Sequence, residues 1–215
     1  MRKIAFLDLV FYVGIPYLLW NYGRDPLGDY YAMLLSTVPG FVYTVYRFIQ
    51  QKQLNMMGLF IIDSLVLSTA VNILSSNAEN MLWNQVYLGY LFAAVYLFSI
   101  LFKKPLALTF AIDFAFLQGY PRENSKALYS TQGIFMWFQL LTSLFFFRGV
   151  FQNTFKAWLI SNYGVNGYDQ MLIYLTISGW IFNGLIFAGF IFISSKINHF
   201  LEENEFQFPI SHTEG

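Results

Sequence analysis

The sequence predicts an all-α fold, a polytopic membrane helix bundle with about six transmembrane helices and one interfacial helix after the fourth span. Two observations of composition predict it: 57% of the 215 residues are hydrophobic, and only 11% are charged. Soluble domains carry about 25% charged residues, so this chain is far outside that class. A third observation is that the apolar residues form six segments of the length that crosses a bilayer, about 17–25 residues. These segments are residues 4–22, 29–48, 56–74, 84–102, 132–152 and 171–195.

The first two segments each contain a proline near the middle, Pro16 and Pro39. Both are candidate helix breaks, because a proline leaves one backbone carbonyl of the preceding turn without its helical donor. In transporters, interrupted helices at corresponding positions of two halves mark a substrate site. Both prolines lie in the first half of this chain, and this asymmetry favours kinks that serve helix packing.

The third segment is apolar along its length but carries Asp63 and Asn72. A carboxylate placed in hydrocarbon costs roughly 2.5–3.5 kcal/mol on insertion scales. We therefore expect Asp63 to face other helices, water or a partner protein.

An apolar stretch of 12 residues, 106–117, follows the fourth segment and Pro105. It is too short to cross a bilayer, so it predicts an interfacial or re-entrant helix. Thr109 and Asp113 lie four residues apart and are expected on one helical face, directed toward the lipid headgroups. The polar and basic residues 121–130 predict a surface turn or a short helix.

The six spans and their loops form one predicted domain, residues 1–199, in which we find no internal repeat. The remaining residues, 200–215, include Glu202, Glu203 and Glu205. This composition predicts a disordered, acidic cytoplasmic tail.

Basic residues are distributed unevenly among the predicted loops. Nine of the 12 lysines and arginines fall on one side of the membrane, whereas Arg24 and Lys156 fall on the other. The positive-inside rule then places both ends of the chain in the cytoplasm. Trp20, Trp83 and Trp158 are expected at the outer boundary, where aromatic side chains gather.

Six polar residues within the spans form a candidate buried polar site. A rise of 1.5 Å per helical residue places them in an inner layer, about 6–15 Å from the cytoplasmic face, and an outer layer at about 24 Å. The inner layer can line a path for a solute, a cation or a proton, with Asp63 as the binding group. Alternatively, the six groups bond one another across the bundle, and Arg148 extends to the outer headgroups. The inner layer is Asp8, Asp63, Gln139 and Asn183, and the outer layer is Asn72 and Arg148.

Composition argues against several classes of function. The chain has no cysteine, and both of its histidines, His199 and His212, follow the last span, so no disulfide and no buried multi-histidine metal site is expected. Sparse basic residues and a formal net charge of zero argue against nucleic-acid binding. We find no phosphate loop, no Ser-His-Asp set and no paired carboxylates at helical spacing. The sequence therefore predicts no catalytic residue, no metal and no cofactor.

Three stretches of the sequence carry a family resemblance: LDLVFYVGIPYLLWNY, STVPGFVYTVYRF and LFKKPLALTFA. In this order they resemble an uncharacterised bacterial family of six-helix inner-membrane proteins, which is itself similar to the intracellular septation protein A group. The resemblance covers residues 8–115, with a looser match through Trp137 and Arg148. It implies a compact six-helix bundle with both ends cytoplasmic and a link to cell-envelope synthesis and division. Asp113 departs from the basic or neutral residues expected there, which argues against a purely basic headgroup-binding segment.

Three hypotheses of function stay open. The first is a non-enzymatic protein of the bacterial plasma (inner) membrane that supports envelope or membrane integrity by binding other membrane proteins or itself. The alternative is a small transporter or channel for a cation, a proton or a small polar solute that uses the polar layer of Asp63. A third, less supported hypothesis is a membrane enzyme or an immunity factor acting on a lipid-soluble compound. A watery cavity at Asp63 would favour transport, and a dry bond from Asp63 to Asn183 would favour the first hypothesis.

Overall fold

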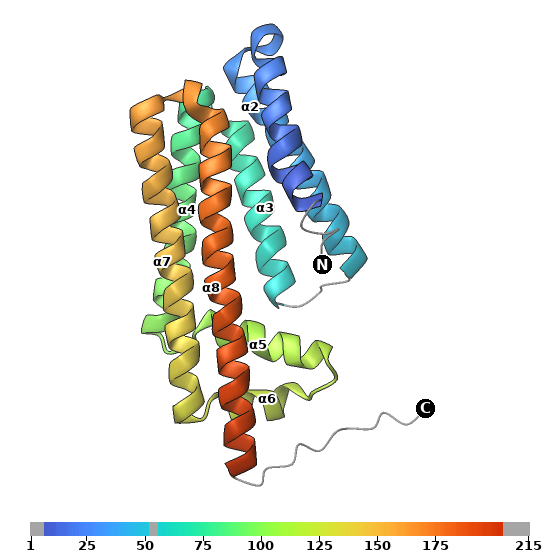
Figure 1. The fold of residues 1–215 in the computed structure, drawn as a ribbon, viewed down its shortest axis with the longest axis vertical. Helices are drawn as coiled ribbons and strands as arrows, with labels where there is room; N and C mark the ends of the chain where they lie inside the picture. The colour runs from blue at the N-terminus through green and yellow to red at the C-terminus, as the bar shows by residue number, and fades with distance from the viewer. Residues whose placement is uncertain (1–6, 52–55, 204–215) are drawn as a thin grey trace. The chain divides into compact units, whose positions relative to one another are not determined.

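The computed structural model describes residues 7–51 and 56–203, and almost all of these residues are helical (Figure 1). No strand occurs within these two ranges. The predicted all-α fold is therefore confirmed for the described chain. The elements are η1 (Val10–Gly14), α2 (Ile15–Gln51), α3 (Met56–Leu74), α4 (Ala78–Leu101), α5 (Leu106–Leu117), α6 (Arg122–Tyr129), α7 (Gln132–Tyr163), η2 (Val165–Gly167) and α8 (Tyr168–Glu203).

Five helical stretches of the described chain are long and apolar enough to cross a membrane, which is consistent with a multi-pass membrane protein. Several helices extend beyond the predicted spans: α4, for example, begins at Ala78 rather than at residue 84. α7 continues to Tyr163 rather than ending at residue 152, because neither proline nor glycine occurs between residue 152 and Gly164, whose φ of 58° is not helical. α8 continues to Glu203, so the first residues of the expected tail are helical, while 204–215 lie outside the described residues. The five stretches are Leu7–Gln50, Met56–Leu74, Ala78–Leu101, Gln132–Tyr163 and Val165–Glu202.

The first of these stretches is a helical hairpin rather than one straight helix (Figure 1). Gly28 lies at φ 77° and ψ 164°, a conformation that glycine adopts without strain and that reverses the chain. Contacts between the two arms are centred on this residue. The Tyr12 hydroxyl lies 2.8 Å from that of Thr44, and Arg24 donates to Asp29 over 2.6 Å close to the turn.

The two predicted helix breaks have different outcomes. Before Pro16 the helix widens into the π-helical turn Val10–Gly14, in which the Ile15 N–H donates to the Val10 carbonyl. A wider turn is one way to accommodate a proline, which has no N–H to donate. At Pro39 the backbone keeps helical dihedral angles, since among residues 15–51 only Gly28 departs from them. The neighbouring Gly40 instead allows close approach: a Cβ there would lie 3.1 Å from the Tyr12 ring.

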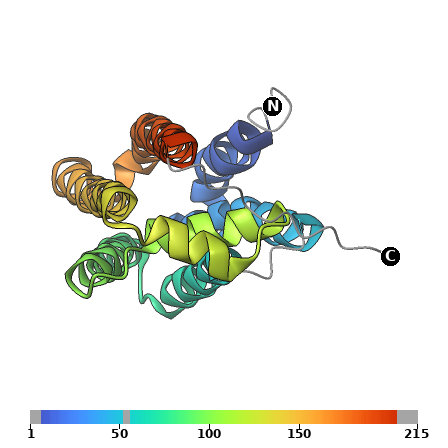
Figure 2. The same cartoon turned by 90° about the horizontal axis from the view of Figure 1, so that it is seen from below.

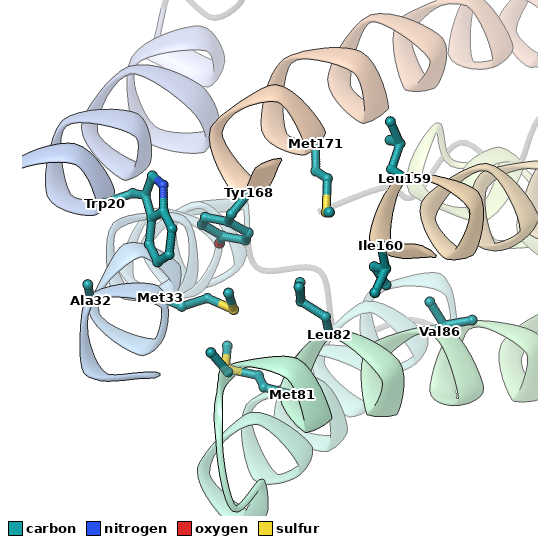
Figure 3. Close-up of a cluster of buried hydrophobic side chains, with 11 residues drawn as sticks. Trp20, Ala32, Met33, Met81, Leu82, Val86, Leu159, Ile160, Tyr168 and Met171 are labelled. Carbon is teal, nitrogen blue, oxygen red and sulfur yellow. The ribbon is translucent and has the colours of Figure 1, made fainter. Parts of the chain in front are cut away.

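The chain forms two compact units, each with its own apolar core. In described residues, the first unit is 7–51, 58–91 and 150–180, and the second is 56–57, 92–149 and 181–203. In the first core, the Trp20 and Tyr168 rings meet edge to face with their centroids 5.1 Å apart (Figure 3). This core draws on α2, α4, α7 and α8, and consists of Trp20, Ala32, Met33, Ala78, Met81, Leu82, Val86, Leu159, Ile160, Tyr168 and Met171.

The second unit contains the predicted short helices, α5 and α6. Both pack against α7 and α8 through a core that includes Leu108, Leu128, Phe138 and Ile193. α5 runs across the long axes of α7 and α8, and it lies beside α6 when the molecule is seen from below (Figures 1 and 2). The sequence therefore predicted α5 with both of its ends, Leu106 and Leu117.

Candidate functional site

The structure divides the six residues of the candidate polar site equally between the two units. Asp8, Asp63 and Asn72 belong to the first unit, and Gln139, Arg148 and Asn183 belong to the second. Within either unit, no hydrogen bond or ion pair of the described chain joins two of these six side chains. Within a unit, the residues of each polar layer expected from depth are therefore not bonded to one another.

Asp8 pairs with a basic residue of the opposite hairpin arm. Its carboxylate lies 3.1 Å from the Arg47 guanidinium, which also lies over the Tyr43 ring at 5.7 Å. Both charged side chains are about one-third exposed. Exposed pairs of this kind contribute little to stability, so this pair is a surface contact between the open ends of the hairpin rather than a buried site.

Asn72 is the most deeply buried of the six, with 6% of its surface exposed. Its side-chain oxygen accepts a 2.7 Å hydrogen bond from the Gln85 amide, and the other end of that amide accepts from the Lys156 ammonium. Its backbone carbonyl accepts from the Tyr30 hydroxyl over 3.1 Å. A polar chain thus connects α3, α4 and α7 inside the first unit.

Sequence reasoning missed two members of this chain, Gln85 and Lys156. Lys156 was assigned to an outer loop because the fifth span was ended at residue 152, whereas it lies well inside α7. The uninterrupted run from Asn153 to Tyr163 could have revealed this. Gln85 lies at the start of the predicted fourth span, residues 84–102, where a polar side chain is common and does not suggest a buried contact. Because its hydrogen bonds link residues of three helices, the chain Asn72–Gln85–Lys156 is suited to joining α3, α4 and α7.

Asp63 has the opposite surroundings. Its side chain is exposed near the middle of α3, and the described chain contains no donor bonded to its carboxylate. Only Gly58 and Asn72 of this helix are buried. Asp63 lies within a stripe of exposed residues that recurs every three or four positions: Met56, Leu59, Val66, Leu67, Ala70 and Ile73.

The three candidates of the second unit show no shared site. Arg148 is half-buried and interacts electrostatically with the Tyr96 phenol. Gln139 is half-buried, and its backbone carbonyl accepts from the Ser143 hydroxyl. Asn183 is exposed on α8. Among the described residues, neither the Gln139 nor the Asn183 side chain is hydrogen-bonded.

The predicted orientation of Asp113 is wrong. Only 3% of its surface is exposed, so it does not face the lipid headgroups. Its carboxylate accepts a 2.7 Å hydrogen bond from the Met56 backbone N–H at the start of α3, and it lies 3.1 Å from the Arg122 guanidinium. A helix N-terminus presents unbonded N–H groups and a partial positive charge, which a carboxylate satisfies well. Within the second unit, Asp113 therefore joins α5 to α6 and to the backbone of Met56 and Met57.

Comparison with known proteins adds no assignment. No family model, no curated protein and no solved structure matches the chain. Within the described residues, no cluster of histidine, cysteine, aspartate and glutamate has the composition of a metal site. The feature of the described chain that bears most directly on function is therefore the exposed Asp63 carboxylate.

Proposed function

We propose that this chain is a non-enzymatic protein of the bacterial inner membrane that binds another membrane protein through the exposed face of α3 and so supports envelope or membrane integrity. The observation that carries the proposal is the exposed Asp63 carboxylate, which has no bonded partner among the described residues. The family resemblance of residues 8–115 is the reason for assigning the role to the envelope.

The proposed architecture has six spans, with α5 lying along the cytoplasmic surface. The hairpin supports a double crossing, because its arms of α2 meet side by side and reverse at Gly28. The direction of α5, across α7 and α8, supports its position in the membrane plane (Figure 1). The excess of basic residues on one side supports cytoplasmic ends. Cysteines at Ser76 and Asn162 should therefore react with an impermeant thiol reagent outside intact cells, and a cysteine at Gln118 should not.

The membrane supplies the physical reason for a protein partner at Asp63. A carboxylate exposed to hydrocarbon costs roughly 2.5–3.5 kcal/mol, and neighbouring side chains such as Leu59 and Leu67 cannot hydrogen-bond to it. A transmembrane helix of another protein with a cationic or hydrogen-bond-donating side chain at the same depth would remove this penalty. A second copy bringing its own Asp63 would place two carboxylates together, which repel each other.

Site-specific photo-crosslinking in cells tests the proposal. A photoreactive residue at Leu67, one turn from Asp63 on the same face, should crosslink to a discrete membrane protein. Asp63→Leu should weaken this crosslink roughly tenfold, because it removes the acceptor from a membrane-buried polar contact. The captured protein should lose the crosslink equally when its own donor is replaced by leucine. The same photoreactive residue at Phe187, exposed on α8, is the matched control.

Two results would overturn the proposal. One is a crosslink at Leu67 that does not depend on Asp63, because the carboxylate would then not recognise the partner. The other is ion or solute flux into proteoliposomes that wild-type protein supports and Asp63→Asn abolishes, which would establish the transport alternative. No hydrogen-bonded chain leads away from Asp63 in the described residues, so the structure gives transport no comparable support.

A further inference from the structure

The last turn of α5 exposes three large apolar side chains. Phe114 is 62% exposed, Phe116 50% and Leu117 58%. We call these three residues the α5 tip. The earlier turns of α5 differ, because Ala107, Leu108 and Phe110 are buried in the second unit. The exposure is therefore concentrated at one end of the helix.

Two cationic side chains adjoin the α5 tip. The Arg122 guanidinium lies over the Phe116 ring at 4.6 Å and makes an ion pair of 3.1 Å with Asp113. Arginine has five N–H donors, so this single ion pair leaves others for a further acceptor. Lys126 lies one helical turn beyond Arg122 in α6 and is exposed. Glu123, next to Arg122 in the sequence, is also exposed and offsets one of these charges.

We propose that the α5 tip, Arg122 and Lys126 form a binding surface for anionic phospholipids of the cytoplasmic leaflet. The three apolar side chains enter the boundary between headgroups and acyl chains, and the two cations contact the phosphates. Apolar side chains beside cationic ones on a short helix are the residue set that binds an anionic membrane surface. This inference rests on the proposed position of α5 in the membrane plane, but it does not depend on a partner for Asp63.

Asp113 acts here as a positioning residue. Its buried carboxylate fixes the Arg122 guanidinium while it accepts from the N–H groups of Met56 and Met57. A lysine or arginine on a free loop would lose side-chain entropy when it bound a headgroup. Arg122 is already oriented between an aromatic ring and a carboxylate, so less of this entropy is lost on binding.

The absence of cysteine from the sequence allows a direct test with the full chain. We would label Leu117→Cys with an environment-sensitive fluorophore, in nanodiscs of phosphatidylcholine alone or with about one-third phosphatidylglycerol. The label should be quenched by spin-labelled lipids, and more strongly with phosphatidylglycerol. Arg122→Gln and Lys126→Gln should each lower the bound fraction roughly fivefold relative to the free fraction, the effect expected for one basic residue at an anionic surface. Arg122→Lys should retain most of the binding.

The control removes the same charge at the other end of α5. Lys103→Gln and Lys104→Gln change exposed lysines about 18 Å from the tip, beyond the screening length of about 10 Å at 0.1 M salt. They should change the signal of the label less than twofold. A label that stays in water in both lipid mixtures would overturn the inference, and so would a label shielded from water but not quenched by lipid. Neither result would affect the crosslink at Leu67, so the two proposals fail separately.

Discussion

Asn72 and Asp63 are both polar residues of α3, but they differ in burial and in hydrogen bonding. Asn72, in the last two turns, is buried and takes hydrogen bonds from Gln85 and Tyr30. Asp63, in the middle of the same helix, is exposed and has no bonded partner in the described chain. Asn72 is therefore hydrogen-bonded inside the first unit, whereas the described chain leaves Asp63 without a hydrogen-bond partner.

The difference shows why a polar residue within an apolar helix is ambiguous in sequence. Hydropathy marks Asp63 and Asn72 equally as costly in hydrocarbon. Only the neighbouring helices decide which is a structural contact: α4 supplies Gln85 to Asn72, and α7 supplies Lys156 to Gln85. The hydrogen-bonded chain of Asn72 joins helices of the fold, whereas the exposed Asp63 carboxylate is the group that the proposed partner would bind.

The largest effect is expected where α4 and α7 pack behind the Asn72 chain. A Cβ on Gly89 would lie 1.8 Å from the Asn153 side-chain oxygen, so Gly89→Ala must displace that side chain. Overpacking of this kind costs about 1–3 kcal/mol of unfolding free energy. Gly184→Ala is the matched control, since a Cβ there meets no atom within 4 Å and should change stability little. Reversible unfolding in mixed micelles measures the unfolding free energy of both variants. Equal changes in Gly89→Ala and Gly184→Ala would show that the α4–α7 contact is loose.

A smaller effect is expected from the hydrogen bond between Asn72 and Gln85. Asn72→Leu leaves the half-buried Gln85 amide without its acceptor, which costs about 1–2 kcal/mol. Replacing both residues with leucine should cost less than the sum of the single changes. The coupling in this double-mutant cycle should be about 0.6 kcal/mol, the average for interhelical bonds in membranes. Strict additivity would mean that the contact contributes nothing to stability, and would weaken the contrast with Asp63.

Local signals made much of the fold predictable, and long-range contacts made the site unpredictable. The bounds of α3 and α5 follow from apolar runs with polar residues or Pro105 beside them. The end of α7 was predicted too early because Lys156 suggests a loop when its acceptor on α4 is unknown. Asp113 was given the wrong face for the same reason, since its partners Met56 and Arg122 lie on other helices. Residue types predicted which positions are polar, but not what each would bond.

The smallest effect on stability, and the most informative, is expected at Asp63. In the purified chain in detergent, Asp63→Asn and Asp63→Leu should change the unfolding free energy by less than about 0.5 kcal/mol, as for surface changes that break no contact. Asn72→Leu in the same assay is the control that proves the measurement sensitive. In cells, the larger effect should come from the other residue: Asp63→Leu should weaken the Leu67 crosslink roughly tenfold, and Asn72→Leu should leave it in any molecules that fold. If Asp63→Leu destabilises the isolated chain as much as Asn72→Leu does, the carboxylate is bonded within the chain. The proposal of a partner at the exposed face of α3 would then be overturned. If Asp63→Asn alone keeps both the fold and the crosslink, hydrogen bonding rather than charge recognises the partner, and the donor on that protein is a neutral side chain.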